Sequence, residues 1–117
     1  MSEIVSLEDY QGSAGRPGGL PDVFFDRREF ELILNLYFRM VAKGEWRDYA
    51  IGHDRESCAF SVFRRSADSP LYRILKTPKL ARKQGAYAVL AGGRVLKRGK
   101  TLAGALDFFN RKRLQLV

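Results

Sequence analysis

The chain has very little cysteine and histidine. Its 117 residues include one cysteine, Cys58, and one histidine, His53. One cysteine cannot form an internal disulfide, and this pair alone falls short of the ligand set of a usual zinc site. We therefore predict no metal site and no bound cofactor. The scarcity of cysteine fits the reducing environment of the cytoplasm.

The chain also lacks a long apolar run and a basic start. The best candidate for a membrane span, residues 33–41, is interrupted by Asn35 and Arg39. It is far shorter than the roughly 18 uninterrupted apolar residues that a span needs. The first ten residues carry three acidic side chains and no basic one, whereas a secretory signal or transit peptide begins with basic residues. These features predict a cytoplasmic protein without a membrane partner.

The hydrophobic content is enough for one folded domain. Hydrophobic residues make up 45% of the chain and aromatic residues 12%, which predicts a single compact core at this length. Residues 1–21 contain four glycines, Pro17 and Pro21 and show no hydrophobic period. This composition predicts a disordered N-terminal leader, followed by a single α+β domain over residues 22–117.

A helix is predicted to begin after residue 26. Asp26 followed by Glu29 gives a capping box, and Gly44 supplies the stop. Between these ends, apolar residues recur at helical spacing or widen the stripe that they form. They are Phe30, Ile33, Leu34, Leu36, Tyr37, Phe38, Met40 and Val41.

Five short β-type runs divided by turn residues follow, at residues 46–51, 59–65, 71–76, 86–91 and 94–98. Gly92-Gly93 predicts a two-residue hairpin loop between the last two runs. The register predicted from this loop pairs Ala91 with Arg94, Leu90 with Val95, Val89 with Leu96, Ala88 with Lys97 and Tyr87 with Arg98.

A second helix closes the chain. Thr101 is its predicted N-cap, and its predicted buried stripe is Leu102, Ala105, Leu106 and Phe109. The predicted fold is therefore α+β: an antiparallel β-meander of about five strands with an N-terminal amphipathic helix and a C-terminal helix packed on the sheet. Residues 23–25 are predicted to form a short strand or a helix staple before these elements.

Six sequence motifs follow one another along the domain: FDRREF (25–30), LYFRMVAKGEWRDYAI (36–51), FSVFRR (60–65), PLYRI (70–74), KTPKLARKQGAY (76–87) and VLKRG (95–99). In order and spacing they resemble a small family from alphaproteobacteria that is catalogued only as a domain of unknown function. The resemblance covers about residues 22–117. It supports a bacterial source and one domain, and it implies no activity, ligand or catalytic residue.

Motifs of known enzyme classes are incomplete. Gly99, Lys100 and Thr101 stand before the closing helix like the end of a phosphate-binding loop, but that loop needs glycine at position 94, which is arginine. The single cysteine and the single histidine lack a partner set for nucleophilic catalysis. We predict that they are a core residue and a solvated loop residue, that there is no catalytic residue, and that an enzyme is the least supported class.

Charge is distributed unevenly along the chain. Residues 64–117 hold 14 Lys and Arg side chains and two acidic ones, a net charge of +12, whereas residues 1–63 have a net charge of −4. A basic half of this kind indicates a polyanionic partner such as nucleic acid or an acidic protein.

The first functional hypothesis is a non-catalytic module that binds nucleic acid with low sequence specificity. Cations follow phosphates in such modules, and aromatic faces stack on bases. The candidate binding residues are Arg73, Lys76, Lys79, Arg82, Lys83, Tyr87, Arg94, Lys97, Arg98 and Lys100.

Rival hypotheses stay open for the same features. In the first, the protein is an interaction or regulatory domain whose basic half docks an acidic protein. In the second, the wide apolar stripe of the first helix, including Leu32 at its polar edge, forms a homodimer. A solvated basic sheet edge that discourages strand pairing would account for the charge without any partner.

Overall fold

The structure, a computed structural model, describes residues 21–65 and 69–115. The predicted leader therefore lies almost wholly outside the described residues. Helix α2 (Arg27–Ala42) comes first, then strands β1 (Asp48–His53), β2 (Cys58–Phe63) and β3 (Tyr72–Lys76), the short 3-10 helix η1 (Pro78–Leu80), strands β4 (Tyr87–Ala91) and β5 (Arg94–Gly99), and helix α3 (Leu102–Gln115).

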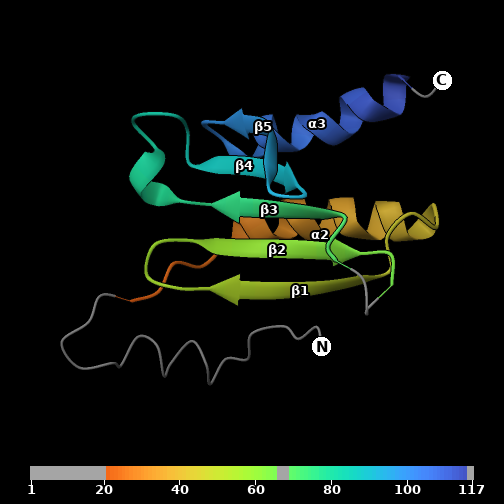
Figure 1. Ribbon diagram of the computed structural model, residues 1–117, viewed down its shortest axis with the longest axis horizontal. Helices are drawn as coiled ribbons and strands as arrows, with labels where there is room; N and C mark the ends of the chain where they lie inside the picture. Colours follow the sequence, from red (N-terminus) through yellow and green to blue (C-terminus); the bar gives the residue numbers. More distant parts are fainter. Residues whose placement is uncertain (1–20, 66–68, 116–117) are drawn as a thin grey trace.

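The five strands form one antiparallel sheet in the order β1-β2-β3-β4-β5. Figure 1 shows both helices behind this sheet, so that one face is covered, whereas no helix of the described residues lies on the other. The predicted α+β meander is confirmed. Residues 23–25 do not form a strand: the backbone N–H of Val23 donates to the Asp54 carbonyl at 2.7 Å, and Phe25 is buried in the core.

The predicted capping box begins α2. The Glu29 backbone N–H donates to the Asp26 carboxylate, and the Asp26 backbone N–H donates to the Glu29 carboxylate, each at 2.8 Å. At the other end Gly44 has φ +77, the left-handed conformation that favours glycine after a helix. Both predicted ends of this helix are confirmed.

The buried face of α2 is rotated relative to the predicted stripe. Ile33, Leu36 and Tyr37 are buried, but Phe38 is 61% exposed and Val41 is 37% exposed. The reason is that Glu29 is also buried, at 8% exposure, and the face that it shares with Ile33 and Leu36 is the one turned to the sheet.

Asp26→Ala should lower the free energy of unfolding by about 1 kcal/mol, because it removes one half of the capping box and a negative charge near the positive helix end. Chemical denaturation measures this as a lower midpoint with an unchanged slope. Arg27→Ala is the matched control, since the Arg27 side chain is 94% exposed and makes only a surface ion pair with Glu31. Equal midpoints for the two variants would contradict the role of the cap.

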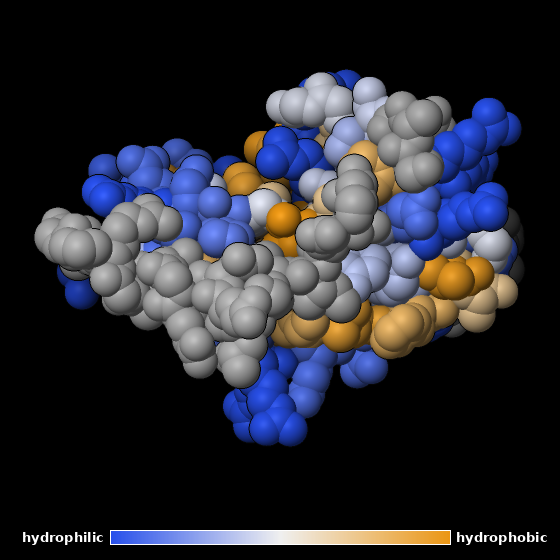
Figure 2. All heavy atoms as spheres, turned by 90° about the horizontal axis from the view of Figure 1, so that it is seen from below, coloured by the Kyte–Doolittle hydropathy of each residue, from blue (hydrophilic) through white to orange (hydrophobic). Residues whose placement is uncertain are grey.

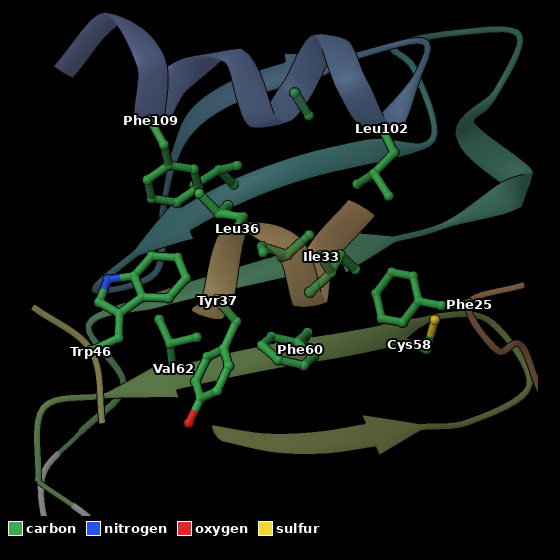
Figure 3. Close-up of a cluster of buried hydrophobic side chains, with 13 residues drawn as sticks. Phe25, Ile33, Leu36, Tyr37, Trp46, Cys58, Phe60, Val62, Leu102 and Phe109 are labelled. Atoms are coloured by element: carbon green, nitrogen blue, oxygen red, sulfur yellow. The ribbon is translucent and has the colours of Figure 1, made fainter. Parts of the chain in front are cut away.

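The core fills the space between the helices and the covered face of the sheet. Directly opposed residues of neighbouring strands give one apolar row across it, Ile51, Phe60, Ile74 and Val89. Figure 3 shows Ile33, Leu36 and Tyr37 of α2 and Leu102 and Phe109 of α3 pointing into this layer. Trp46 closes one end against Phe109, with ring centroids 5.3 Å apart.

The predicted register of the β4–β5 hairpin holds only next to the turn. Ala91 pairs with Arg94 and Leu90 with Val95, but a β-bulge then shifts the ladder. Beyond it Val89 pairs with Lys97, Ala88 with Arg98 and Tyr87 with Gly99. The extra residue is Leu96, and because successive side chains alternate, this insertion reverses the faces expected for Lys97 and Arg98.

Helix α3 begins as predicted. The Thr101 hydroxyl accepts from the Gly104 backbone N–H at 3.0 Å, and the Thr101 carbonyl accepts from the Ala105 backbone N–H at 3.1 Å. Leu102, Ala105 and Phe109 are buried. No helix in the described parts of the chain combines the length and the apolar character that crossing a membrane requires.

Candidate functional site

The candidate binding residues are divided among four places. Lys76 and Tyr87 face the covered side of the sheet, as does Lys97 on the outermost strand. Arg73 lies near the middle of the open face, and Arg94 adjoins the Gly92-Gly93 turn at one end. The others, Lys79, Arg82, Lys83, Arg98 and Lys100, gather at the opposite end, and we call this surface the basic end.

Lys76 and Tyr87 belong to a polar cluster beneath the start of α2. One cross-strand row on the covered face consists of His53, Cys58, Lys76, Tyr87 and Gly99. Glu29 of α2 completes the cluster: its carboxylate accepts from the Lys76 ammonium at 2.7 Å and from the Tyr87 hydroxyl.

Each polar group in this cluster has a partner. The Lys76 ammonium also donates to the Phe24 carbonyl at 2.8 Å, and its side chain is only 16% exposed. Burial raises the pKa of Tyr87, and the hydrogen bond to Glu29 and the negative charge of that carboxylate raise it further. The cluster therefore binds the N-terminal turn of α2 to β3 and β4, and Lys76 and Tyr87 are used inside the protein.

Cys58 adjoins the cluster and is a core residue, as the sequence predicted. Its side chain is 2% exposed, and burial raises the pKa of the thiol to about 12. His53 differs from the prediction of a solvated residue. Its Nδ1 lies 2.9 Å from the Asp22 carboxylate, and its ring packs against Phe24 at a centroid distance of 4.4 Å.

Cys58 should resist alkylation in the folded protein, because the reactive form is the thiolate and burial keeps the thiol protonated. Iodoacetamide followed by mass spectrometry should find no label at neutral pH without denaturant and full label with it. The folded pKa of Cys58, about 12, lies above the unfolded value of about 8.5. The contribution of the protonated thiol to the free energy of unfolding is therefore fully present below the unfolded pKa, and it is lost as the pH rises toward the folded pKa. Rapid labelling of the native protein would contradict this account.

The basic end is assembled by a close contact between two glycines. Gly85, at φ +102, ends the segment that follows η1, and a Cβ there would lie 2.5 Å from the Gly99 carbonyl oxygen and 3.1 Å from the Lys100 nitrogen. The Arg98 guanidinium also donates to the Gly85 carbonyl at 3.0 Å. Residues 78–84, which carry Lys79, Arg82 and Lys83, are thus held beside the β5–α3 corner, which carries Arg98 and Lys100.

This contact also explains Gly99, Lys100 and Thr101 without a phosphate-binding loop. A Cβ on Gly99 would lie 2.9 Å from the Ala105 nitrogen, so glycine allows β5 to turn directly into α3. Gly99 ends a strand, and Thr101 caps a helix. The positive end of that helix adds to the charge of the basic end.

The charges of the basic end are mostly exposed. Lys79, Arg82, Lys83 and Lys100 are exposed, and Arg98 is half-buried. Lys79 lies 2.6 Å from the Glu56 carboxylate, but both side chains are at least 60% exposed, and such surface pairs contribute little. Figure 2, seen from below, shows hydrophilic residues at this end of the molecule, on the left, and again at the right, with hydrophobic residues from the centre along the lower edge.

The side chains of residues 21–65 and 69–110 include no group of three or more His, Cys, Asp or Glu placed to hold a metal ion. Every buried side-chain nitrogen or oxygen there has a hydrogen-bond partner.

The chain was compared with known families and proteins. The model of a family described as "Protein of unknown function (DUF2794)" matches residues 23–106. No curated protein and no solved structure matches the chain.

Proposed function

Because this chain belongs to the DUF2794 family of proteins of unknown function, whose description assigns no activity, we propose a function from the structure. The protein is a small non-catalytic module that binds nucleic acid through phosphate contacts, with low sequence specificity. The observation that carries this proposal is the basic end, where five cations from two separate segments meet around the contact between Gly85 and Gly99.

The contacts of this module are electrostatic and do not include base stacking. Tyr87 donates to Glu29 inside the protein, and Tyr49 and Tyr72 pack against core rings. Sheet proteins that bind single strands stack bases on exposed aromatic faces. Because the five residues of the basic end include no aromatic ring, binding there depends on phosphates, which single and double strands of any sequence share.

Salt dependence tests this proposal. If the basic end contacts phosphates of duplex DNA, log K should fall linearly with log salt at about 0.9 per contact. Replacing Lys79, Arg82 and Lys83 with glutamine should reduce that slope by about 2 to 3 on duplexes of unrelated sequence. An unchanged slope would remove the basic end from the proposal. Absence of binding at about 50 mM salt, where phosphate contacts are strong, would favour an acidic protein as the partner.

A second candidate function is self-association through α2. Phe38 and Val41 are neighbours on one side of this helix and are 61% and 37% exposed, and exposed apolar patches mark association sites. Leu32, at 43%, lies on the opposite side of the helix from Val41 and does not belong to this patch. The partner in this candidate is a second copy of the chain. Sedimentation should then show a dimer whose fraction rises with concentration, and Phe38→Ser should abolish it. A monomer at all concentrations would contradict this function.

A further inference from the structure

The open face of the sheet is more apolar than a solvated face. Two cross-strand rows make up its centre. They are Gly52, Ala59, Leu75, Ala88 and Arg98, and Ala50, Ser61, Arg73, Leu90 and Val95. Antiparallel sheets with one solvated face normally place polar residues on it, but here only Ser61 and the two arginines are polar. Val95 is 49% exposed.

Arg73 stands on this face and makes no ion pair or hydrogen bond through its side chain with any of the described residues. A shallow hollow lies on each side of it. One hollow, of about 230 Å³, extends from Arg73 and Leu75 to His53 and Asp54 at the β1–β2 turn. The other, of about 450 Å³, extends from Arg73 and Ser61 to the Gly92-Gly93 turn. An apolar face with a central unpaired guanidinium fits a segment that carries apolar residues and carboxylates.

The chain itself supplies such a segment. Residues 1–10 contain Ile4, Val5 and Leu7 together with three carboxylates and no basic residue. The three carboxylates are Glu3, Glu8 and Asp9. This segment is therefore complementary to the face in both charge and hydrophobicity.

The first described residues of the chain lie at the edge of the same open face, beside the β1–β2 turn. Asp22 contacts His53 at 2.9 Å, and Val23 donates to Asp54 at 2.7 Å, and both partners line the hollow beside Arg73. Residues 11–20 include four glycines, and a Gly-rich segment of that length spans on the order of 17 Å. Arg73 lies on the third strand, two strand spacings or about 10 Å from β1. The connection is long enough.

We propose that residues 1–10 bind across the open face of the sheet, with a carboxylate of this segment on Arg73. This contact covers Leu75, Leu90 and Val95. It does not depend on nucleic-acid binding, since Arg73 lies outside the basic end, although the two surfaces adjoin at Arg98.

A spin label tests this proposal in the full chain. Because Cys58 is buried, Ser6→Cys can be labelled selectively with a nitroxide. Amide NMR signals of Ser61, Leu75 and Leu90 should then be broadened, whereas those of Leu32 and Ala103 on the helices should not. Arg73→Gln should restore the signals, and Arg47→Gln, which removes the same charge elsewhere, should leave them broadened.

A second variant keeps the test decisive if Arg73→Gln does not fold. Glu3→Gln, Glu8→Gln and Asp9→Asn together change no described residue, and they should also restore the signals. Broadening that is absent, or equal on both faces of the sheet, would overturn the proposal. So would broadening that appears between labelled and unlabelled copies in a mixture, because the contact would then belong to a second chain.

Discussion

Glu29→Gln should lower the free energy of unfolding by about 3 kcal/mol, the largest effect expected of any polar substitution in this protein. The Glu29 and Lys76 side chains are 11% and 16% exposed, and their charged atoms are 2.7 Å apart. Removing one charge leaves the other in a poorly solvated place, which typically costs about 3–5 kcal/mol. We expect the lower end of this range because water still reaches both groups.

A double-mutant cycle separates this pair from its surroundings. Lys76→Met alone leaves Glu29 with the Asp26 backbone N–H and the Tyr87 hydroxyl as donors. The double variant Glu29→Gln, Lys76→Met should be clearly more stable than the sum of the single effects, because no unpaired charge remains. Tyr87→Phe, which removes one hydrogen bond, should cost about 1 kcal/mol. If the effects of the Glu29 and Lys76 substitutions on the free energy of unfolding simply add in the double variant, the contact between these two side chains is contradicted.

Gly85→Ala should lower the free energy of unfolding by about 3 kcal/mol or more, because two costs add. An alanine at φ +102 is strained by about 1–3 kcal/mol. Its Cβ would also lie 2.5 Å from the Gly99 carbonyl oxygen, an atom of the backbone that cannot turn aside. The segment after η1 would have to move away from the β5–α3 corner. Denaturation midpoints measure the loss.

Gly52→Ala is the matched control for this substitution. Gly52 lies in β1 and has no positive φ, and a Cβ added there would meet no atom within 4 Å. Its replacement should change stability by less than about 0.5 kcal/mol. If the two alanine variants melt alike, the contact between Gly85 and Gly99 does not hold the basic end together.

Local signals in the sequence determined much of this fold. Asp26 and Glu29 predicted the start of α2, Gly44 predicted its end, and Thr101 predicted the start of α3, because caps depend on residues close in sequence. The β4–β5 register failed beyond Leu90 because nothing in the pattern reveals the bulge at Leu96. One inserted residue was enough to reverse the faces of Lys97 and Arg98.

The candidate site was harder to predict because it depends on contacts between distant residues. A signal for the polar cluster was present: if Ile74 and Val89 face the core, Lys76 and Tyr87 two residues away must face it too. The partner, Glu29, is 47 residues from Lys76, and no local pattern connects them. The meeting of residues 78–84 with the β5–α3 corner likewise depends on the approach of Gly85 to Gly99.

The most direct test of nucleic-acid binding by the basic end compares two variants of equal charge. One replaces Arg82, Lys83 and Lys100 with glutamine, and the other replaces Arg47, Arg64 and Arg65, which are also exposed but lie outside the basic end. At about 50 mM salt the first variant should bind a duplex of arbitrary sequence on the order of 100-fold more weakly than the unmodified protein, because two to three phosphate contacts are lost. The second should bind within a few fold of it. Equal losses in both variants would show that net charge alone attracts the nucleic acid, and would contradict a binding surface at the basic end.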